Sequence, residues 1–588
     1  MTIVHDIRQS PGTRGTRRGV SAAGLWTALK DNVLSVVIVL ILLALVGPPV
    51  ITLVQSSFSE LNVDLSAGGF SARHYAKLLS APDLGILVIN SLLFAGGATA
   101  ISLAVGSILA WLVERTDVAG KELAYITAIV SLGTPSILKV AAWLYLFGRQ
   151  GPFNEAARAI LGTQGALFQV NSLIGMILIE GMIWIPMVFL MMSATFRSAN
   201  AEMEEAARMS GATVVETVRL VSLRMARPAI LALAMFVFIR NIEAFEVPAL
   251  VGMPAHVDVL TTELYHSMRA MPPDIGYASA FSVVLLLTVS VLLYFYGRLS
   301  RQAERYASIT GKGYRPRPFR LGRLRRVGLA ILILNFVVLL ILPMIGLLWV
   351  ALTPFVQPMR LSGLQHLTLK NFSAVISDAY YLKLVFNTLV VAGGAATAAM
   401  VLSLAAGWLA ARRKPGGIVI DQLITIPLVF PGLVLGVAML QVALGAPVPL
   451  YGTLWVIGLA FLIRYMPFGM RYTYNGVLQV HSELEQAAAV SGATTRQSML
   501  KIVVPLVTPA LAAGWIYIFL LCGKEVSLPL LLAGPQSQTI PPAMYNMWNN
   551  GQLGEVAALG LLWSAALAAL AYIFDRLSRR KSVSTFQH

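Results

Sequence analysis

The chain has 588 residues, of which 57% are hydrophobic and only 12% are charged. A water-soluble protein of this length needs far more charge to cover its surface, so the composition excludes an ordinary soluble protein. The net charge of +17 at pH 7 does not indicate a nucleic-acid partner, because the basic residues collect in particular loops between apolar runs. Cys522 is the only cysteine, which excludes an internal disulfide and a cysteine-based metal site.

Apolar runs of about 20 residues, long enough to cross a bilayer as helix, recur along the chain. The first run follows a basic tail and is too long for the core of a signal peptide, so we expect it to be retained. Because a helix satisfies its backbone amides within its own segment, we expect an all-α integral membrane protein with about 12 transmembrane helices. The predicted spans are 33–55, 84–112, 122–147, 172–196, 229–252, 277–298, 327–352, 384–410, 418–444, 453–476, 509–533 and 556–576.

Basic residues predict the orientation of these spans. If the N-terminus is cytoplasmic, alternation places on the inside the segments that hold the arginine clusters, as the positive-inside rule requires. These inside segments are 113–121, 197–228, 299–326, 411–417, 477–508 and the C-terminus. The predicted domains are a tail 1–32, a first half 33–298, a basic linker 299–326 against anionic lipid headgroups, a second half 327–576 and a tail 577–588.

The two halves repeat each other. Asn90–Arg115 matches Asn387–Arg412 at an offset of 297 residues, and the polar segment Glu202–Ile230 matches Glu483–Leu511 at an offset of 281. Both copies have the same predicted orientation, which indicates a parallel repeat about an axis along the membrane normal. In each polar segment, compact alanines precede a glycine that permits a tight bend.

Ionisable residues interrupt the fifth and eleventh predicted spans. Charges inside spans are costly and usually face a cavity or a partner. Two interpretations stay open: the charges line a substrate passage, or they pair with one another and hold the halves together. The residues are Arg240, Glu243 and Glu246 in the first half and Lys524 and Glu525 in the second, with Lys139, Glu180, Arg464 and Arg471 as further candidates on other spans. We also expect Pro248 and Pro529 to kink their helices.

Catalytic and metal-binding patterns are absent from the sequence. The seven histidines are scattered without metal-ligand spacing, and no Ser/His/Asp or Cys/His arrangement is visible. No sequence of the phosphate-binding loop type occurs. We therefore expect neither catalysis nor a metal site, and no cofactor bound by this chain.

The twin polar segment resembles the EAA loop of permease subunits in type I ABC importers. In the second copy, Gln486 stands where the family has glutamate, and Glu485 precedes it. The resemblance covers nearly the whole chain, and the single fused chain, the linker sequence GKGYRPR and the segment 147–154 are similar to the ferric-iron group of fused permeases. The residues that the resemblance assigns to ATPase coupling are Glu204, Glu205, Ala206, Ala207 and Gly211 in loop 197–228, and Glu485, Ala487, Ala488 and Gly492 in loop 477–508.

This resemblance implies a pseudo-twofold permease fold in a bacterial inner membrane, with both termini cytoplasmic. The implied partners are two copies of a nucleotide-binding ATPase subunit, which hold the ATP and Mg, a periplasmic or lipid-anchored solute-binding protein, and membrane lipid. The implied cargo is ferric iron or another small charged solute. The alternative is an ion-coupled secondary transporter with two six-helix halves, which has no reason to keep the twin loops.

Overall fold

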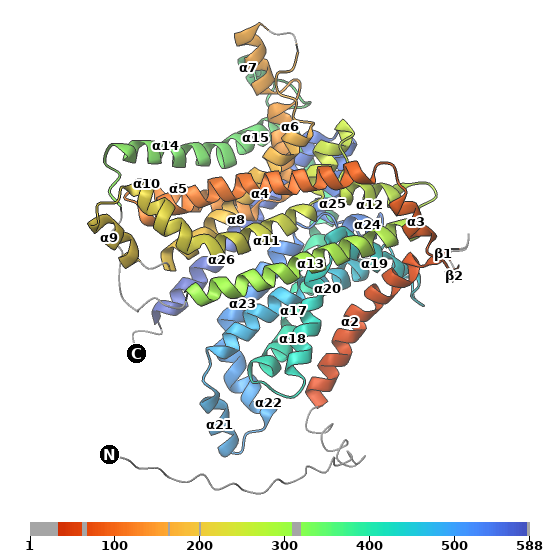
Figure 1. Ribbon diagram of the computed structural model, residues 1–588. Coiled ribbons are helices and arrows are strands. Elements are labelled where there is room, and N and C mark those ends of the chain that lie inside the picture. The colour runs from red at the N-terminus through yellow and green to blue at the C-terminus, as the bar shows by residue number, and fades with distance from the viewer. Residues whose placement is uncertain (1–32, 62–66, 163–164, 199–200, 308–318, 585–588) are drawn as a thin grey trace.

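The computed structural model describes residues 33–61, 67–162, 165–198, 201–307 and 319–584 (Figure 1). The predicted N-terminal tail, the centre of the predicted linker and the last four residues lie outside this part of the chain. The described chain is almost entirely helical, with one antiparallel hairpin formed by β1 (Ser59–Leu61) and β2 (Ala67–Phe70).

The helices follow one another in two series. The first series is α2 (Val33–Ser57), α3 (Arg73–Leu79), α4 (Leu84–Arg115), α5 (Lys121–Gly133), α6 (Ser136–Phe147), α7 (Pro152–Leu161), α8 (Leu173–Ser198), α9 (Ala201–Met209), α10 (Val214–Thr217), η1 (Val218–Ser222), α11 (Leu223–Ile242), η2 (Pro248–Gly252), η3 (Met253–Ala255), α12 (Leu260–Arg269) and α13 (Ile275–Ala307). The second is η4 (Gly322–Leu324), α14 (Arg325–Phe336), η5 (Val337–Ile341), α15 (Leu342–Leu352), η6 (Leu361–His366), α16 (Lys370–Ser377), α17 (Ala379–Ala411), α18 (Gly417–Thr425), η7 (Ile426–Val429), α19 (Gly432–Leu444), α20 (Leu454–Leu478), α21 (Ser482–Val490), α22 (Thr495–Ser498), η8 (Met499–Val503), α23 (Val504–Cys522), α24 (Pro529–Leu532), α25 (Ile540–Asn549) and α26 (Leu553–Ser584).

The spans agree with the predicted all-α membrane fold. Among the described residues, 10 helices are long and apolar enough to cross a membrane, or up to 12 if each of two bent pairs is one span. The predicted spans 122–147 and 418–444 correspond to the two bent pairs. The chain turns by 108° between α5 and α6, and by 106° between η7 and α19. Pro135 and Pro431 stand at the two breaks, where a proline ring excludes a continuous helix.

The predicted fifth and eleventh spans are broken, so the expectation that Pro248 and Pro529 kink continuous helices is wrong. Helix α11 ends at Ile242 and α23 ends at Cys522, and Pro248 and Pro529 each begin a separate short helix. The ionisable residues predicted in these spans lie at the helix ends and in the irregular segments that follow them. Such segments are tolerated at membrane depth only where protein or a cavity surrounds them.

Within the predicted linker 299–326, α13 continues to Ala307 and helix resumes at Gly322. Its described end joins a loop of the first half. The backbone N–H of Phe319 donates to the Arg115 carbonyl at 2.8 Å, and the Asp117 N–H donates to the Phe319 carbonyl at 3.0 Å. The buried Phe319 ring also lies 6.0 Å from that of Trp111.

Each half is built on one long helix pair, α4 with α8 and α17 with α20. The first helix of each half also packs on the other half. Helix α2 contacts α17, α18 and α19, whereas α15 contacts α6 and α14 contacts α5. The halves are therefore interlocked and do not form two separate bundles.

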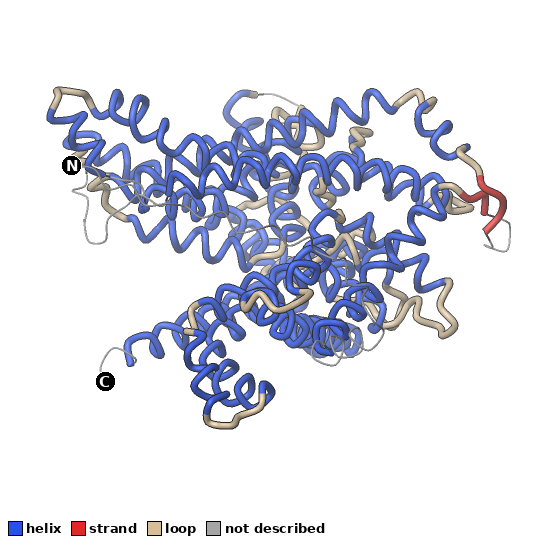
Figure 2. Tube along the Cα trace, turned by 60° about the horizontal axis from the view of Figure 1, so that its bottom comes forward, coloured by secondary structure: helices blue, strands red, loops and turns tan. Residues whose placement is uncertain are grey.

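The halves meet at one end and separate at the other. Helices α12 and α25 bring the rings of Tyr265 and Tyr545, which are 280 positions apart, to 6.2 Å, and Phe245 packs on both. At the opposite end, α9 and α21 lie at the tips of two helical groups that diverge from each other (Figures 1 and 2). The halves therefore contact each other at the α12–α25 end and diverge towards the polar loops.

The close helix pairs predict a stability effect. A Cβ atom at Gly106 would lie 2.6 Å from Cγ1 of Val188, whereas one at Gly96, on the same helix, would meet nothing within 4 Å. We expect Gly106→Ala to destabilise the chain by about 1–3 kcal/mol through overpacking of α4 against α8. Thermal unfolding in mild detergent measures the change, with Gly96→Ala as the control that leaves the midpoint unchanged or raises it. Equal midpoints for the two variants would contradict this packing.

Candidate functional site

The twin loops have the same local structure, element for element. In each, a nine-residue helix (α9 or α21) is followed by a glycine, a four-residue helix (α10 or α22) and a π-helical turn (η1 or η8) that continues into the next span. Gly211 and Gly492 adopt φ angles of +89° and +83°, in the left-handed region that favours glycine. The bend predicted at these two glycines is therefore present.

Both bends are closed by the same hydrogen bonds. The N–H groups of Ala212 and Ala493 donate to the carbonyls of Ala207 and Ala488 at 3.1 and 2.9 Å. These bonds span the left-handed glycine and satisfy carbonyls at the helix end, as in a Schellman motif. A matching pair runs from Ser210 and Ser491, whose N–H groups donate to the carbonyls of Ala206 and Ala487. The alanines that the sequence assigns to coupling thus also terminate the helices.

A capping box begins the second helix of each loop, and sequence reasoning missed it. The Thr213 N–H donates to Glu216 at 2.8 Å and the Thr494 N–H donates to Gln497 at 2.8 Å, while each threonine hydroxyl accepts the return bond at 3.3 Å. The backbone N–H of Thr213, and then its hydroxyl, lowers the pKa of the Glu216 carboxyl. The spacing Thr-x-x-Glu/Gln was visible in the sequence as a helix-start signal.

Two acidic residues of the loops pair within the chain. Glu204 accepts from the Ser222 hydroxyl at 2.6 Å and lies 3.7 Å from Arg115, with both charges buried. Its counterpart Glu485 forms a 2.7 Å ion pair with Arg412 and accepts from the Trp408 indole at 3.0 Å. Each of these contacts joins a loop helix to the end of α4 or α17.

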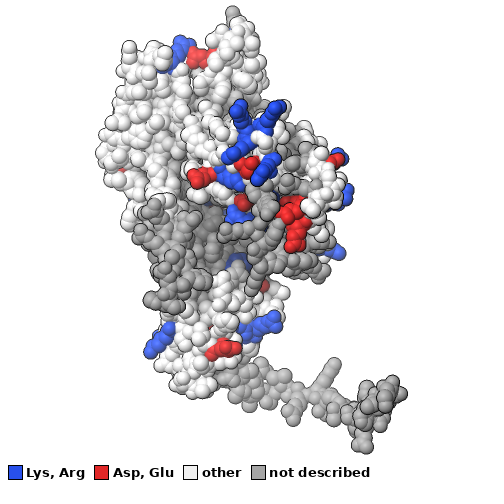
Figure 3. All heavy atoms as spheres, turned by 90° about the vertical axis from the view of Figure 1, so that its left-hand side faces the viewer, with Lys and Arg blue, Asp and Glu red and all other residues white. Residues whose placement is uncertain are grey.

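The outward face of each loop helix carries an apolar residue at the same repeat position. Met209 is 90% exposed and Val490, 281 positions later, is 91% exposed. Ala206 and Ala487 are exposed beside them, and Glu205 is partly buried. Sequence reasoning missed Met209 and Val490, although an aliphatic residue repeated at one position of a polar loop was a visible signal. Viewed from the α9 side, charged groups lie in restricted patches of a largely uncharged surface (Figure 3).

The ionisable residues of the interrupted spans form one cluster with charges from other spans, and its members are buried or partly buried. Charges from both halves interact with one another: Glu243 with Arg464 and Glu525, and Glu246 with Lys524. The cluster holds equal numbers of cations and carboxylates, namely Lys139, Arg240, Arg464 and Lys524 with Glu180, Glu243, Glu246 and Glu525. The structure therefore brings together all five residues predicted for a passage, along with three of the four further candidates, whereas Arg471 lies 3.8 Å from Asp421.

Specific bonds hold this cluster. Arg240 donates to Glu243 at 2.6 Å. Glu525 accepts from the Tyr465 hydroxyl at 2.6 Å and lies 3.7 Å from Arg464. These contacts are the internal pairing that the sequence left open as one interpretation.

Two cations of the cluster bond to backbone carbonyls at the breaks of the bent pairs. The Lys524 ammonium donates to the Leu132 carbonyl at 3.1 Å, and the Arg464 guanidinium donates to the Phe430 carbonyl at 3.0 Å. Leu132 is the residue before the last of α5 in the first half, so the Lys524 bond crosses between the halves. The cations supply donors for carbonyls that the interrupted helices leave without a helical partner.

The sequence profile of one protein family matches the chain twice. The family is the binding-protein-dependent transport system inner membrane component, and the matches cover residues 102–305 and 383–583, well over half of the chain. The two matches confirm the internal repeat.

Curated relatives of this chain include permease proteins of several transport systems. The ferric transport system permease protein FbpB of Actinobacillus pleuropneumoniae is 23% identical over 86% of this chain and 73% of its own length. A putative ferric transport system permease protein, FbpB 1, of Haemophilus influenzae is 23% identical over 79% of this chain and 72% of its own length. The putrescine transport system permease protein PotI of Escherichia coli is 26% identical over 34% of this chain and 74% of its own length.

Solved structures give weaker likenesses. A chain of a bacterial ABC transporter involved in alginate import aligns over 48% of this chain and 99% of its own length, with 16% identity and a TM-score of 0.35. A chain of the MetNI methionine ABC transporter aligns over 34% of this chain and 94% of its own length, with 18% identity and a TM-score of 0.29. The family match, and not these low scores, assigns the fold.

The buried ion pair predicts a large stability effect. We expect Glu525→Gln to destabilise the chain by about 3–5 kcal/mol, because it leaves the Arg464 charge buried without its carboxylate. The control is Asp274→Asn, which removes the largely exposed pair of Lys77 and Asp274 and costs less than about 1 kcal/mol. Unfolding in mild detergent measures both changes. A loss for Glu525→Gln no larger than that of the control would contradict the pairing.

Proposed function

The chain belongs to the family of binding-protein-dependent transport system inner membrane components, and we propose that it forms the solute passage of an ATP-driven importer. The observation that carries this proposal is the pair of loops, one in each half, with the same helix, the same left-handed glycine and the same exposed apolar residue. Two equivalent surfaces suit two copies of one partner. We propose that this partner is a nucleotide-binding ATPase subunit, which supplies the ATP and Mg.

In this proposal each loop helix enters a groove on one ATPase subunit. The exposed faces of Met209 and Val490, with the small Ala206 and Ala487 beside them, offer compact apolar contacts for such a groove. The buried pairing of Glu204 with Arg115, and that of Glu485 with Arg412, then carry the motion of the loops into α4 and α17. Closure of the ATPase dimer draws α9 and α21 together and opens the opposite end, which is a rigid-body switch of access.

The orientation follows from the same proposal. The end that carries α9 and α21 is cytoplasmic, with both chain termini, and the α12–α25 end faces a periplasmic or lipid-anchored solute-binding protein. The positive-inside distribution of arginine supports this assignment. In this orientation the halves contact each other at the periplasmic end and diverge towards the cytoplasm.

For the solute we propose ferric iron or another small charged species. The names of the FbpB relatives support iron. The intramembrane charges Arg240, Glu243, Glu246, Lys524 and Glu525 lie between the halves, where a passage is expected, and intramembrane charges commonly mark such routes.

Coupling is tested by two substitutions at one position. In Gly492→Val, a β-branched side chain must adopt φ near +83°, at a cost of about 1–2 kcal/mol, which would weaken docking of the second loop about tenfold. Gly492→Asn is the matched control, because asparagine tolerates this conformation. Co-purification with the ATPase subunit and ATP-dependent uptake in proteoliposomes are the measurements. We expect co-purification and uptake to fall in Gly492→Val and to persist in Gly492→Asn.

The same proteoliposomes distinguish the alternative function. Uptake that needs ATP and the ATPase subunit supports the importer. Uptake without ATP, driven by an ion gradient and unaffected by Gly492→Val, would establish the ion-coupled secondary transporter instead.

The passage is tested at Glu246. If its carboxylate lines the route, Glu246→Gln should lower the rate of radioactive ferric-iron uptake while ATPase coupling and the unfolding midpoint stay near wild type. Asp421→Asn, which removes a carboxylate 3.8 Å from Arg471 and outside the cluster, is the control. Unchanged uptake in both variants would leave Glu246 with a structural role only.

A further inference from the structure

The segment 147–154 leads into α7, a helix that the proposed function does not use. Helix α7 lies apart from the rest of the chain, beyond α6 (Figure 1). The second half has no helix at the corresponding place, because the chain from α19 to α20 passes through a short irregular connection at 445–453. Helix α7 is therefore an addition to one half only.

Specific contacts fix α7 to the end of α6. The fully buried Asn154 side chain donates to the carbonyls of Phe147 and Gly148 at 2.9 Å, and its oxygen accepts from the Phe168 N–H at 2.8 Å. The Phe147 ring stacks on Phe153, with centroids 4.6 Å apart. These bonds give α7 a defined orientation, so the face that it turns outward is set by the fold.

The outward face of α7 is apolar. Its charged residues are held by the protein: Glu155 forms an ion pair with Arg360, and Arg158 donates to the Arg149 carbonyl at 2.8 Å. The residues that face outward are Ala156, Ala159 and Ile160, spaced three and four apart on one side of the helix, and Ile160 is 81% exposed. A helix surrounded by water shows the reverse arrangement, with its charges outward and its apolar side inward.

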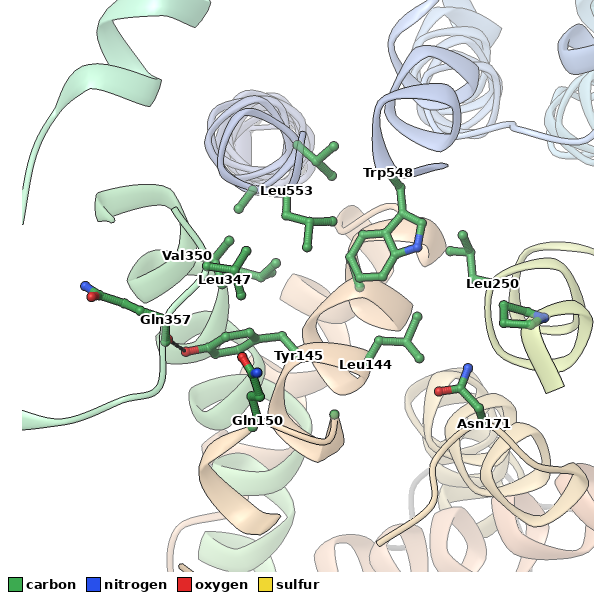
Figure 4. Close-up of a pocket in the computed structure, with 17 residues that line it drawn as sticks. Leu144, Tyr145, Gln150, Asn171, Leu250, Leu347, Val350, Gln357, Trp548 and Leu553 are labelled. Carbon is green, nitrogen blue, oxygen red and sulfur yellow. Dashed lines mark hydrogen bonds between the residues drawn. The ribbon is translucent and has the colours of Figure 1, made fainter. Parts of the chain in front are cut away.

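A cavity of about 310 Å³ lies at the base of α7, between α6, α15, α25 and α26. Leu144, Leu553 and Trp548 point towards one another across it, while the Tyr145 hydroxyl turns away to the Gln357 carbonyl at 3.0 Å (Figure 4). Most of the lining is apolar, and the polar side chains are Gln150, Asn171 and Gln357 together with Tyr145 and Trp548. The cavity volume is within the range of about 300–1,000 Å³ typical of ligand sites.

We propose that a phospholipid binds here, from the leaflet at the α12–α25 end of the chain. One acyl chain fills the apolar cavity, and α7 lies on the membrane surface with the Ile160 face in the boundary between headgroups and acyl chains, as amphipathic interfacial helices do. Trp548 and Tyr145 are aromatic residues of the kind enriched at that depth. The exposed Ile345 and Leu348 of α15 continue the apolar surface towards the bilayer.

The position of the cavity in the bundle favours lipid as its occupant. The cavity joins α6 of the first half to α15 and α26 of the second, at the surface of a multi-span bundle that acyl chains surround. The guanidinium of Arg360, which pairs with Glu155 and is 67% exposed, supplies a cation at the level of the headgroup phosphate. Lipid binding at this site does not depend on ATPase coupling, so it can be tested independently of the proposed function.

The position of α7 is tested with single fluorescent labels on the full chain in phospholipid nanodiscs. Cys522 is the only cysteine and is buried, so an introduced cysteine can be labelled selectively. We expect a label at Ile160→Cys to be quenched severalfold more by nitroxide phospholipids than one at Asn550→Cys, an exposed polar position at the end of α25. Equal quenching of the two labels, or protection of Ile160→Cys by a solute-binding protein and not by lipid, would overturn the proposal.

The cavity is tested by filling it. Ala557 lines the cavity and is 1% exposed, so Ala557→Phe should displace the acyl chain, and native mass spectrometry of the purified chain should show the loss of one retained phospholipid. Val401→Phe, on an exposed apolar face, is the matched control and should retain the lipid. Leu553→Ala enlarges the cavity without filling it, and should also retain the lipid, which separates displacement from misfolding. If Ala557→Phe retained as much phospholipid as the wild-type chain, the proposed acyl-chain site would be overturned.

Discussion

The cost of an unpaired charge or backbone carbonyl in the bilayer underlies the arrangement of this chain. Two spans are broken at Pro135 and Pro431, and carbonyls near each break lose their helical partners. Lys524 and Arg464 donate to carbonyls at these breaks. Those cations in turn require carboxylates, which the interrupted fifth and eleventh spans provide. One charge-balanced cluster therefore forms where the four irregular segments of the two halves meet.

The internal repeat gives both halves similar backbones, but the side chains at equivalent positions differ in charge and in their contacts. At the position where the first half has Glu243, the second has Lys524, so the repeat axis relates charges of opposite sign. Near the loops, Trp408 donates to Glu485, whereas Trp111 packs on Phe319 from the end of the linker. Similar backbones thus hold unlike contacts, and the two loops are fastened to their halves in different ways.

The path from the loops into the bundle is short. A buried or half-buried arginine at the end of α4 or α17 holds the acidic residue of each loop helix. Each of these long helices packs along α8 or α20, in which Pro186 and Pro467 occupy equivalent positions. A displacement of either loop therefore reaches a rigid helix pair directly, because packed helices move as units and do not deform continuously.

Hydropathy, charge and repetition in the sequence determined the membrane class, the number and places of the spans, the two halves and the twin loops with their glycine bends. These features depend on local composition and spacing, so a single chain segment is enough to reveal them. Only the tertiary structure decided which charges meet. Glu204 and Glu485 face arginines 89 and 73 residues away, and Lys524 reaches a carbonyl in the other half, because packing between distant helices selects these partners. The breaks at Pro135 and Pro431 also needed the structure, since the hydropathy continues across both prolines while only the packing around them provides donors for the exposed carbonyls.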